Sequence, residues 1–164
     1  MIARPGVTTW YLEMTDAAQL RAARPVAGFE VQRIEPPHPA LSSRMYEAVG
    51  GPWQWTDRLG WDHDRWGAHL ERDTVETWVG RLDGEPAGYA ELVREGDEVE
   101  VASFGLLPGF AGRGLGGALL SAVTADAWER GARRVWLHTC SLDSPAALPS
   151  YERRGFRCYH EENG

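Results

Sequence analysis

The sequence of 164 residues contains no lysine, so all 17 of its basic residues are arginine. A bias of this kind is typical of a GC-rich genome, and by itself it predicts no function. The missing lysine does exclude one class of site. A Walker phosphate loop needs a lysine side chain to reach the phosphates, so this chain holds no such loop.

Long hydrophobic runs are also absent. No stretch of eighteen apolar residues occurs, which argues against a transmembrane helix and a membrane partner. The N-terminal stretch MIARPGVTTWYLEM has no basic segment followed by a long apolar one, so we expect no signal peptide. The only cysteines, Cys140 and Cys158, are not spaced as metal ligands. We therefore expect free thiols in a reducing compartment, no metal site and a cytoplasmic protein.

The charge is unevenly distributed along the chain. Residues 1–104 hold 10 arginines and 18 acidic residues, whereas residues 105–164 hold 7 arginines and 6 acidic residues. The acidic first part argues against a nucleic-acid partner and favours a cationic one. An anion is better tolerated by the second part.

The length and composition favour one domain over residues 1–164 with one hydrophobic core. A mixed α/β sheet is expected, because an antiparallel meander precedes the order strand, helix, strand, helix, strand. Asp-Gly at 83–84 predicts the tight turn of a hairpin. Thr15 is expected to cap the first helix, and Gly131 to end the helix that follows the central strand. The expected strands are 7–14, 29–34, 75–82, 85–93, 99–107, 133–140 and 155–160, and the expected helices are 15–23, 40–51, 62–72, 115–130 and 144–154.

A glycine-rich loop stands immediately before the helix expected at 115–130. Within GLLPGFAGRGLGGALL (105–120), five glycines fall in the nine residues 109–117. Glycine is costly to order, so this density predicts that the backbone itself approaches a ligand closely. Consecutive backbone N–H groups at a helix N-terminus favour an anion such as a phosphate.

Two other interpretations of the loop are weaker. Gly112, Gly114 and Gly117 match the dinucleotide fingerprint G-x-G-x-x-G, but that site needs a parallel βαβ start and an acidic residue about 20 positions later. Gly131 and Ala132 stand where the acid belongs. A merely tight turn is the second alternative, and it does not need glycines that continue into the first helical turn.

Two motifs carry a family resemblance. FGLLPGFAGRGLGGALL resembles the acyl-CoA-binding motif of the GCN5-related N-acetyltransferase superfamily, and SPAALPSYERRGF (144–156) resembles its later motif, in which a helix with a tyrosine leads to Gly-Phe. The resemblance covers residues 75–161. It implies a mixed, mostly antiparallel sheet that is splayed between its fourth and fifth strands and flanked by helices. Residues 75–161 would form the acetyl-CoA-binding core, and residues 1–74 approximately the acceptor-side segment.

The resemblance also implies cofactor contacts. Leu106 and Leu107 would hydrogen-bond the pantetheine arm or the acetyl carbonyl. The pyrophosphate would lie on the backbone amides of Gly112, Arg113, Gly114, Leu115, Gly116 and Gly117.

Two positions depart from the family pattern. Ala111 stands where the pattern has Gln or Arg, three residues before Gly114, so one side-chain contact is missing and Arg113 would partly replace it. Ser144 stands in place of the usual asparagine, and its hydroxyl can still donate or accept a hydrogen bond.

Acetyl transfer to an amine needs a base, donors for the developing oxyanion and an acid for the leaving thiolate. The resemblance assigns the acid, or the stabiliser of the thiolate, to Tyr151; the alternative is a tyrosine that packs on the pantetheine. The base is Glu100, at the start of the central strand, or His138, in the family's fifth strand, whose imidazole titrates near neutral pH. Alternatively, Glu100 is only a solvated charge at the edge of a strand, and His138 is only a structural residue of the core whose hydrogen bonds are satisfied. Two other routes would need neither residue as the direct base: proton transfer through a chain of water molecules, and a covalent acyl-enzyme intermediate on Cys140.

The acceptor is expected beside PWQWTDRLGWDHDRW (52–66), which holds four of the eight tryptophans and three aspartates. Such segments cover the acceptor site in the superfamily, and aromatic faces with carboxylates suit an ammonium group. Alternatively, the tryptophans only pack a helical pair onto the sheet. Our expected acceptor residues are Trp53, Trp55 and Asp57.

The sequence therefore predicts transfer of an acetyl group from acetyl-CoA to the amine of a small cationic molecule, by direct attack in a ternary complex. A protein or peptide N-acetyltransferase, a non-catalytic acyl-CoA sensor and a nucleotide-binding oxidoreductase are the alternatives. A homodimer is compatible with the resemblance, since dimers are common in the superfamily.

Overall fold

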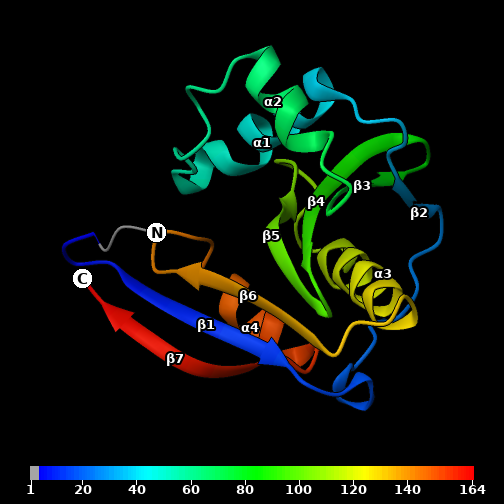
Figure 1. Cartoon of the computed structure of the whole chain (residues 1–164). Helices are drawn as coiled ribbons and strands as arrows, with labels where there is room; N and C mark the ends of the chain where they lie inside the picture. The colour runs from blue at the N-terminus through cyan, green and yellow to red at the C-terminus, as the bar shows by residue number, and fades with distance from the viewer. Residues whose placement is uncertain (1–3) are drawn as a thin grey trace.

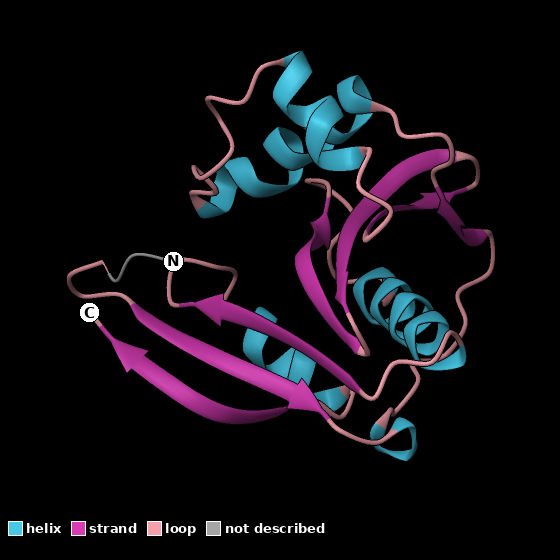
Figure 2. Ribbon diagram, in the orientation of Figure 1, coloured by secondary structure: helices cyan, strands magenta, loops and turns pink. Residues whose placement is uncertain are grey.

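A computed structural model of the protein describes residues 4–164 (Figures 1 and 2). Seven strands form one sheet: β1 (Thr8–Met14), β2 (Phe29–Arg33), β3 (Val75–Leu82), β4 (Glu85–Glu95), β5 (Glu98–Leu106), β6 (Arg134–Cys140) and β7 (Arg157–Asn163). Four α-helices flank it, α1 (Pro39–Gly50), α2 (His63–Leu70), α3 (Leu115–Glu129) and α4 (Ala147–Arg153), with 3₁₀ helices η1 (Ala17–Gln19) and η2 (Gly51–Trp53). The mixed α/β fold expected from the sequence is confirmed.

The sheet order is β2-β3-β4-β5-β6-β1-β7. All neighbouring strands are antiparallel except β5 and β6. These two pair only from Glu98↔Arg134 to Glu100↔Trp136 and then diverge, which separates the sheet into two halves (Figure 1). The expected splay is confirmed, and the strands that the resemblance counts as fourth and fifth are β5 and β6 of this chain.

The first strand lies in the half of the sheet that contains the end of the chain. β1 pairs with β6 on one side and with β7 on the other, so Tyr11 stands opposite both His138 and His160. The N-terminal segment therefore contributes to both sides of the splay: β1 to one half, and β2, α1 and α2 to the other (Figure 1).

Local sequence explains two helix starts that differ from expectation. The short helix after β1 is capped by Asp16, not by Thr15, because the Asp16 carboxylate accepts from the Ala18 amide. The Gln19 side chain binds back to the Thr15 and Asp16 amides and completes a capping box. Helix α4 begins at Ala147 instead of at Ser144. Pro149 lacks an N–H and is tolerated only in the first turn, so the helix is short.

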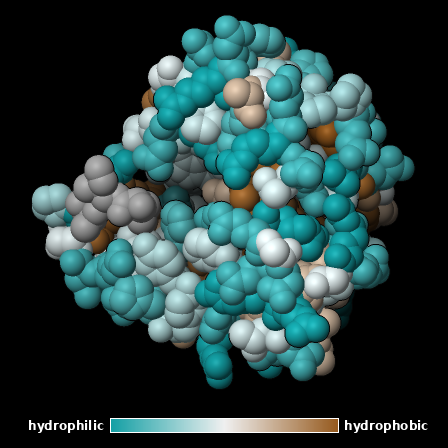
Figure 3. Space-filling view, in the orientation of Figure 1, coloured by the Kyte–Doolittle hydropathy of each residue, from teal (hydrophilic) through white to brown (hydrophobic). Residues whose placement is uncertain are grey.

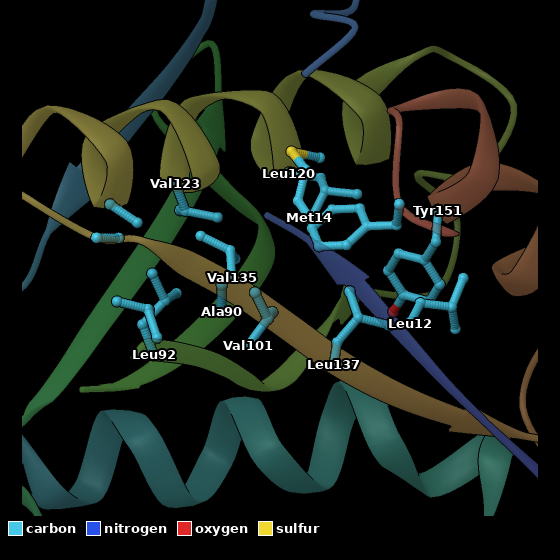
Figure 4. Close-up of a cluster of buried hydrophobic side chains, with 14 of the residues drawn as sticks. Leu12, Met14, Ala90, Leu92, Val101, Leu120, Val123, Val135, Leu137 and Tyr151 are labelled. Carbon is cyan, nitrogen blue, oxygen red and sulfur yellow. The ribbon is translucent and has the colours of Figure 1, made fainter. Parts of the chain in front are cut away.

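The main core lies between α3, α4 and the sheet. It includes Leu12, Leu92, Leu120, Val135 and Leu137 (Figure 4). β4 is buried on both faces from residue 87 to residue 92, since α3 packs on one side and α1 on the other. The surface in Figure 3 is mainly hydrophilic. Within residues 4–164, no helix is long and apolar enough to cross a membrane.

Candidate active site

A cavity of about 910 Å³ lies at the splay of the sheet. It is lined by β5, the glycine loop, the first turn of α3, the end of β6, α4 and the segment before α2. Of the site residues expected from the sequence, all except Arg113 line the cavity. They are Trp53, Trp55, Asp57, Glu100, Leu106, Leu107, Gly112, Gly114, Leu115, Gly116, Gly117, His138, Ser144 and Tyr151. Arg113 is exposed, and its guanidinium lies over the Phe110 ring.

The glycine loop needs glycine for its conformation. Gly109, Gly112 and Gly114 all have positive φ, at 92°, 81° and 77°, a region that L side chains rarely adopt. Gly114 is the N-cap of α3 and, among the residues described, no side chain caps it. The first amides of α3 therefore point out of the helix end without a side-chain partner. Such an arrangement, at the positive end of a helix dipole, could hold an anion.

The edge of β5 that faces the gap is unpaired once β6 diverges. Past Glu100, β5 has hydrogen-bonded partners only on β4 within the described chain. The register shifts between Glu91 and Leu92 of β4, so Ala102 of β5 is a bulged residue without a register partner, and it lines the cavity. Leu107 donates its N–H to the Ala87 carbonyl at 2.8 Å, so that amide is already used. An open strand edge offers backbone groups to an extended ligand that contains amides.

Tyr151 extends from α4 into the core beside the cavity. Its ring packs on Phe104 and Phe156 and lies close to Leu12 and Leu137 (Figure 4). Only 8% of the residue is exposed. Burial, with a smaller contribution from Asp143, raises the pKa of the Tyr151 phenol above its ordinary value, so the hydroxyl keeps its proton at neutral pH.

Glu100 and His138 meet where the two strands separate. Glu100 is in the last paired position of β5, and His138 lies two residues beyond its partner on β6. Their Oε2 and Nε2 atoms are 4.0 Å apart. Burial and then the charge of Glu91 raise the pKa of Glu100, while burial lowers the pKa of His138. Both shifts favour the neutral forms, and groups this close titrate as a pair.

The tryptophans of residues 52–66 divide into two groups. Trp53 and Trp55 line the cavity together with Asp57. Trp55 comes close to the end of α1, where a Cβ on Gly50 would lie 2.3 Å from its ring. Trp61 and Trp66 do not line the cavity and instead pack against Tyr46, Arg58 and His69, of which Tyr46 and Arg58 do line it. One pair of tryptophans therefore lines the cavity, and the other pair packs the helical segment together.

A buried charge network beside the cavity was not predicted from the sequence. Glu91 on β4 is fully buried, and Arg58 binds both of its oxygens, at 2.8 and 2.7 Å. His69 Nε2 lies 2.9 Å from Oε1. Although burial alone raises the pKa of Glu91, these hydrogen bonds hold it below its usual value. One signal was present: Glu91 is the single charged residue within the apolar run of residues 87–93 in β4.

Asp143 was also missed. It follows β6, lines the cavity and accepts hydrogen bonds from Thr139 Oγ1 and the Cys140 amide. Ser144 accepts from the Ala146 amide at 3.2 Å and so caps the turn before α4. Among residues 4–164, no group of three or more His, Cys, Asp or Glu side chains could hold a metal ion.

Comparison with known proteins agrees with this geometry. The chain is 41% identical over 78 residues to an uncharacterised N-acetyltransferase of Mycobacterium bovis, covering 47% of this chain and 49% of that protein. It is 33% identical over 98 residues to the streptothricin acetyltransferase of Streptomyces lavendulae, covering 55% and 49%. The chain thus spans about half the length of the curated relatives it matches.

Solved structures share the fold. A GCN5-related N-acetyltransferase from Sphaerobacter thermophilus matches with a TM-score of 0.76 and 20% identity, over 96% of this chain and 50% of that one. An aminoglycoside acetyltransferase from an uncultured soil sample, crystallised with sisomicin, matches with a TM-score of 0.64 and 11% identity, over 77% and 88%. The model of the Acetyltransferase (GNAT) family matches residues 40–156, and the chain belongs to this family.

Proposed function

We propose that the protein is an acetyl-CoA-dependent N-acetyltransferase that acts on the amine of a small cationic molecule. One observation carries the proposal: the same cavity is lined by the glycine loop, by the Glu100–His138 pair, and by Trp53 and Trp55. An anion cradle at one end and a carboxylate with aromatic faces at the other suit two substrates of opposite charge.

The described residues fit acetyl-CoA. The amides at the start of α3 are free of side-chain caps and would hold the pyrophosphate, with Gly116 and Gly117 leaving the helix surface bare beside them. The open edge of β5 near Leu106 would hold the extended pantetheine. Acetyl-CoA supplies the activated acetyl group and the thiolate leaving group.

The remaining chemistry belongs to side chains of the chain itself. Glu100 would accept a proton from the acceptor ammonium, with His138 beside it. Tyr151, whose raised pKa keeps its proton in place, would protonate the departing thiolate. Backbone N–H groups on the open edge of β5 would stabilise the developing oxyanion.

The acceptor class rests on the wall of the cavity. Trp53 and Trp55 offer aromatic faces, and Asp57 adds a carboxylate that is 76% exposed at 3.9 Å from Arg4. The names of two similar proteins point the same way, since streptothricin and aminoglycosides are cationic small molecules that carry amines. We therefore favour a small polyamine-like or amino-sugar acceptor over a peptide.

A screen of an amine library with acetyl-CoA tests the proposal, read by release of free CoA thiol and by product mass. We expect at least one small cationic amine to gain a single acetyl group. A protein that binds acetyl-CoA but releases no thiol with any amine would be a sensor, and one that acetylates only peptides would be a peptide acetyltransferase. Either result would contradict the proposal.

The pH profile of kcat/KM identifies the base. A base must be deprotonated, so activity rises as pH increases through its pKa; since the pKa of Glu100 is raised, this acidic limb lies above the usual carboxylic range. We expect Glu100→Gln to remove the limb and His138→Ala to retain it. The reverse pattern would make His138 the base.

A further inference from the structure

The acceptor side of the cavity is formed by a segment with little regular structure. Residues 51–61, called here the wall segment, contain only the short helix η2. Gln54, between Trp53 and Trp55, has φ 61°, a conformation that is unfavourable for a residue with a side chain. The backbone hydrogen bonds of this segment are local turn bonds, such as Leu59 N–H to the Thr56 carbonyl and Trp61 N–H to the Arg58 carbonyl. No strand ladder ties it to the sheet, so its position against the sheet depends on contacts made by its side chains.

Arg58 makes the most extensive of these contacts. Its guanidinium forms two parallel hydrogen bonds to Glu91, and its carbon CZ lies 4.8 to 5.8 Å from the ring centroids of Tyr46, Trp61 and Trp66. Its backbone N–H donates to Tyr46 Oη at 3.2 Å. The guanidinium is therefore bound by a carboxylate through its planar fork and lies over the faces of three aromatic rings.

Glu91 connects this clamp to the rigid part of the protein. It lies in the buried middle of β4, opposite Ser103 at the bulge of β5, and Ser103 lines the cavity. His69 on α2 binds the same carboxylate. The network thus joins the wall segment, α2 and the strand next to β5 within one group of side chains.

We propose that Arg58 is a positioning residue for the acceptor amine: clamped between Glu91 and three aromatic rings, it holds Trp55 and Asp57 at the acceptor end of the cavity. The inference rests on the function proposed above. The glycine loop depends on other contacts, among them the bond from Leu107 to Ala87. Loss of Arg58 should therefore weaken use of the acceptor and leave acetyl-CoA binding intact.

The same network acts on the charge of Glu100. Glu91 and Glu95 on β4 favour its protonated form, while Arg58 on the wall segment favours the carboxylate. His138 on β6 faces it at 4.0 Å. Removing Arg58 should move the acidic limb of kcat/KM to higher pH, and Glu91→Gln should move it to lower pH. Opposite shifts would not result from a general loosening of the fold.

The experiment compares Arg58→Met with Arg65→Met, using an amine found in the screen above. Arg65 is a matched control, because it also lies over the Trp61 ring, at 4.6 Å, but is exposed and does not line the cavity. We expect Arg58→Met to raise the acceptor KM by about tenfold to a hundredfold, since small displacements of substrate contacts have effects of this size. The acetyl-CoA Kd should stay within about twofold, and Arg65→Met should change neither.

A second variant covers the case in which Arg58→Met folds poorly and leaves Glu91 with one partner fewer. Arg58→Lys keeps the charge but cannot form the two-bond fork, so its acceptor KM should be intermediate. Equal weakening of acceptor and acetyl-CoA, or an acceptor KM that does not change in either Arg58 variant, would overturn the proposal.

Hydrogen exchange separates this inference from the proposed function. Arg58→Met should speed amide exchange in residues 51–61 and leave residues 106–117 unchanged. If the wild-type protein acetylates no amine, the proposed function fails, but exchange still tests whether Arg58 fixes the wall. Unchanged exchange in residues 51–61 would then overturn the positioning role.

Discussion

Gly116→Asp is expected to weaken acetyl-CoA binding by about 100-fold or more while leaving the protein fully folded. Gly116 lies in the first turn of α3 and lines the cavity, and a Cβ there would meet its nearest neighbour, Leu106, at an ordinary 3.7 Å. The new carboxylate would occupy the anion cradle and repel the pyrophosphate. It would also stabilise the helix end by about 0.5 kcal/mol, so thermal unfolding should not occur earlier.

The neutral isostere Gly116→Asn provides the control for this variant. Calorimetry with acetyl-CoA should show a much smaller loss for Asn than for Asp, because only the charge opposes the phosphates. Equal losses would mean that size alone matters at Gly116. Unchanged affinity in both variants would place the pyrophosphate elsewhere.

Tyr151→Phe is expected to lower kcat by about 100-fold to 1000-fold, the range of general acid catalysis. Phenylalanine preserves the ring that packs on Phe104 and Phe156, so folding and the acetyl-CoA Kd should remain close to those of the wild-type protein. Only the proton that would reach the thiolate is lost. Steady-state kinetics and calorimetry on the same preparation would measure the two effects.

Tyr159→Phe serves as the matched control, since Tyr159 is 45% exposed on β7 and does not line the cavity. Its kcat should not change. A Tyr151→Phe enzyme with wild-type kcat would show that the tyrosine only packs beside the cofactor. An equal loss of acetyl-CoA affinity and of kcat in Tyr151→Phe would also indicate a packing role and not an acid.

Local patterns in the sequence were sufficient to predict most of the fold. Three features depend only on residues close together in the chain: the Asp83–Gly84 turn, the end of α3 before Gly131, and the apolar strands. The cap assigned to Thr15 was wrong, because the Asp16 carboxylate accepts from the Ala18 amide and so caps the helix instead. Local spacing does not reveal which of two adjacent polar side chains will cap a helix.

Residues of the candidate site that belong to a sequence motif could be named from the sequence. Residues that meet only through long-range contacts could not. Arg58 is part of the quoted tryptophan-rich stretch, but its partner Glu91 is 33 residues away on another element. Likewise, no local pattern indicates that Glu100 and His138 meet at 4.0 Å; their contact follows from the parallel pairing of β5 with β6. Sequence reasoning named both residues as rivals, whereas the structure makes them neighbours.

The position of β1 between β6 and β7 has a consequence for biosynthesis. Thr8 and Asn163, which bond through their side chains, are separated by 155 residues, so this half of the sheet depends on contacts between residues far apart in the sequence. Such contacts are slow to form. During translation, β1 must remain without either neighbour until residues 134–163 have left the ribosome, and the side of the cavity that includes β6 is completed after the side formed by β5.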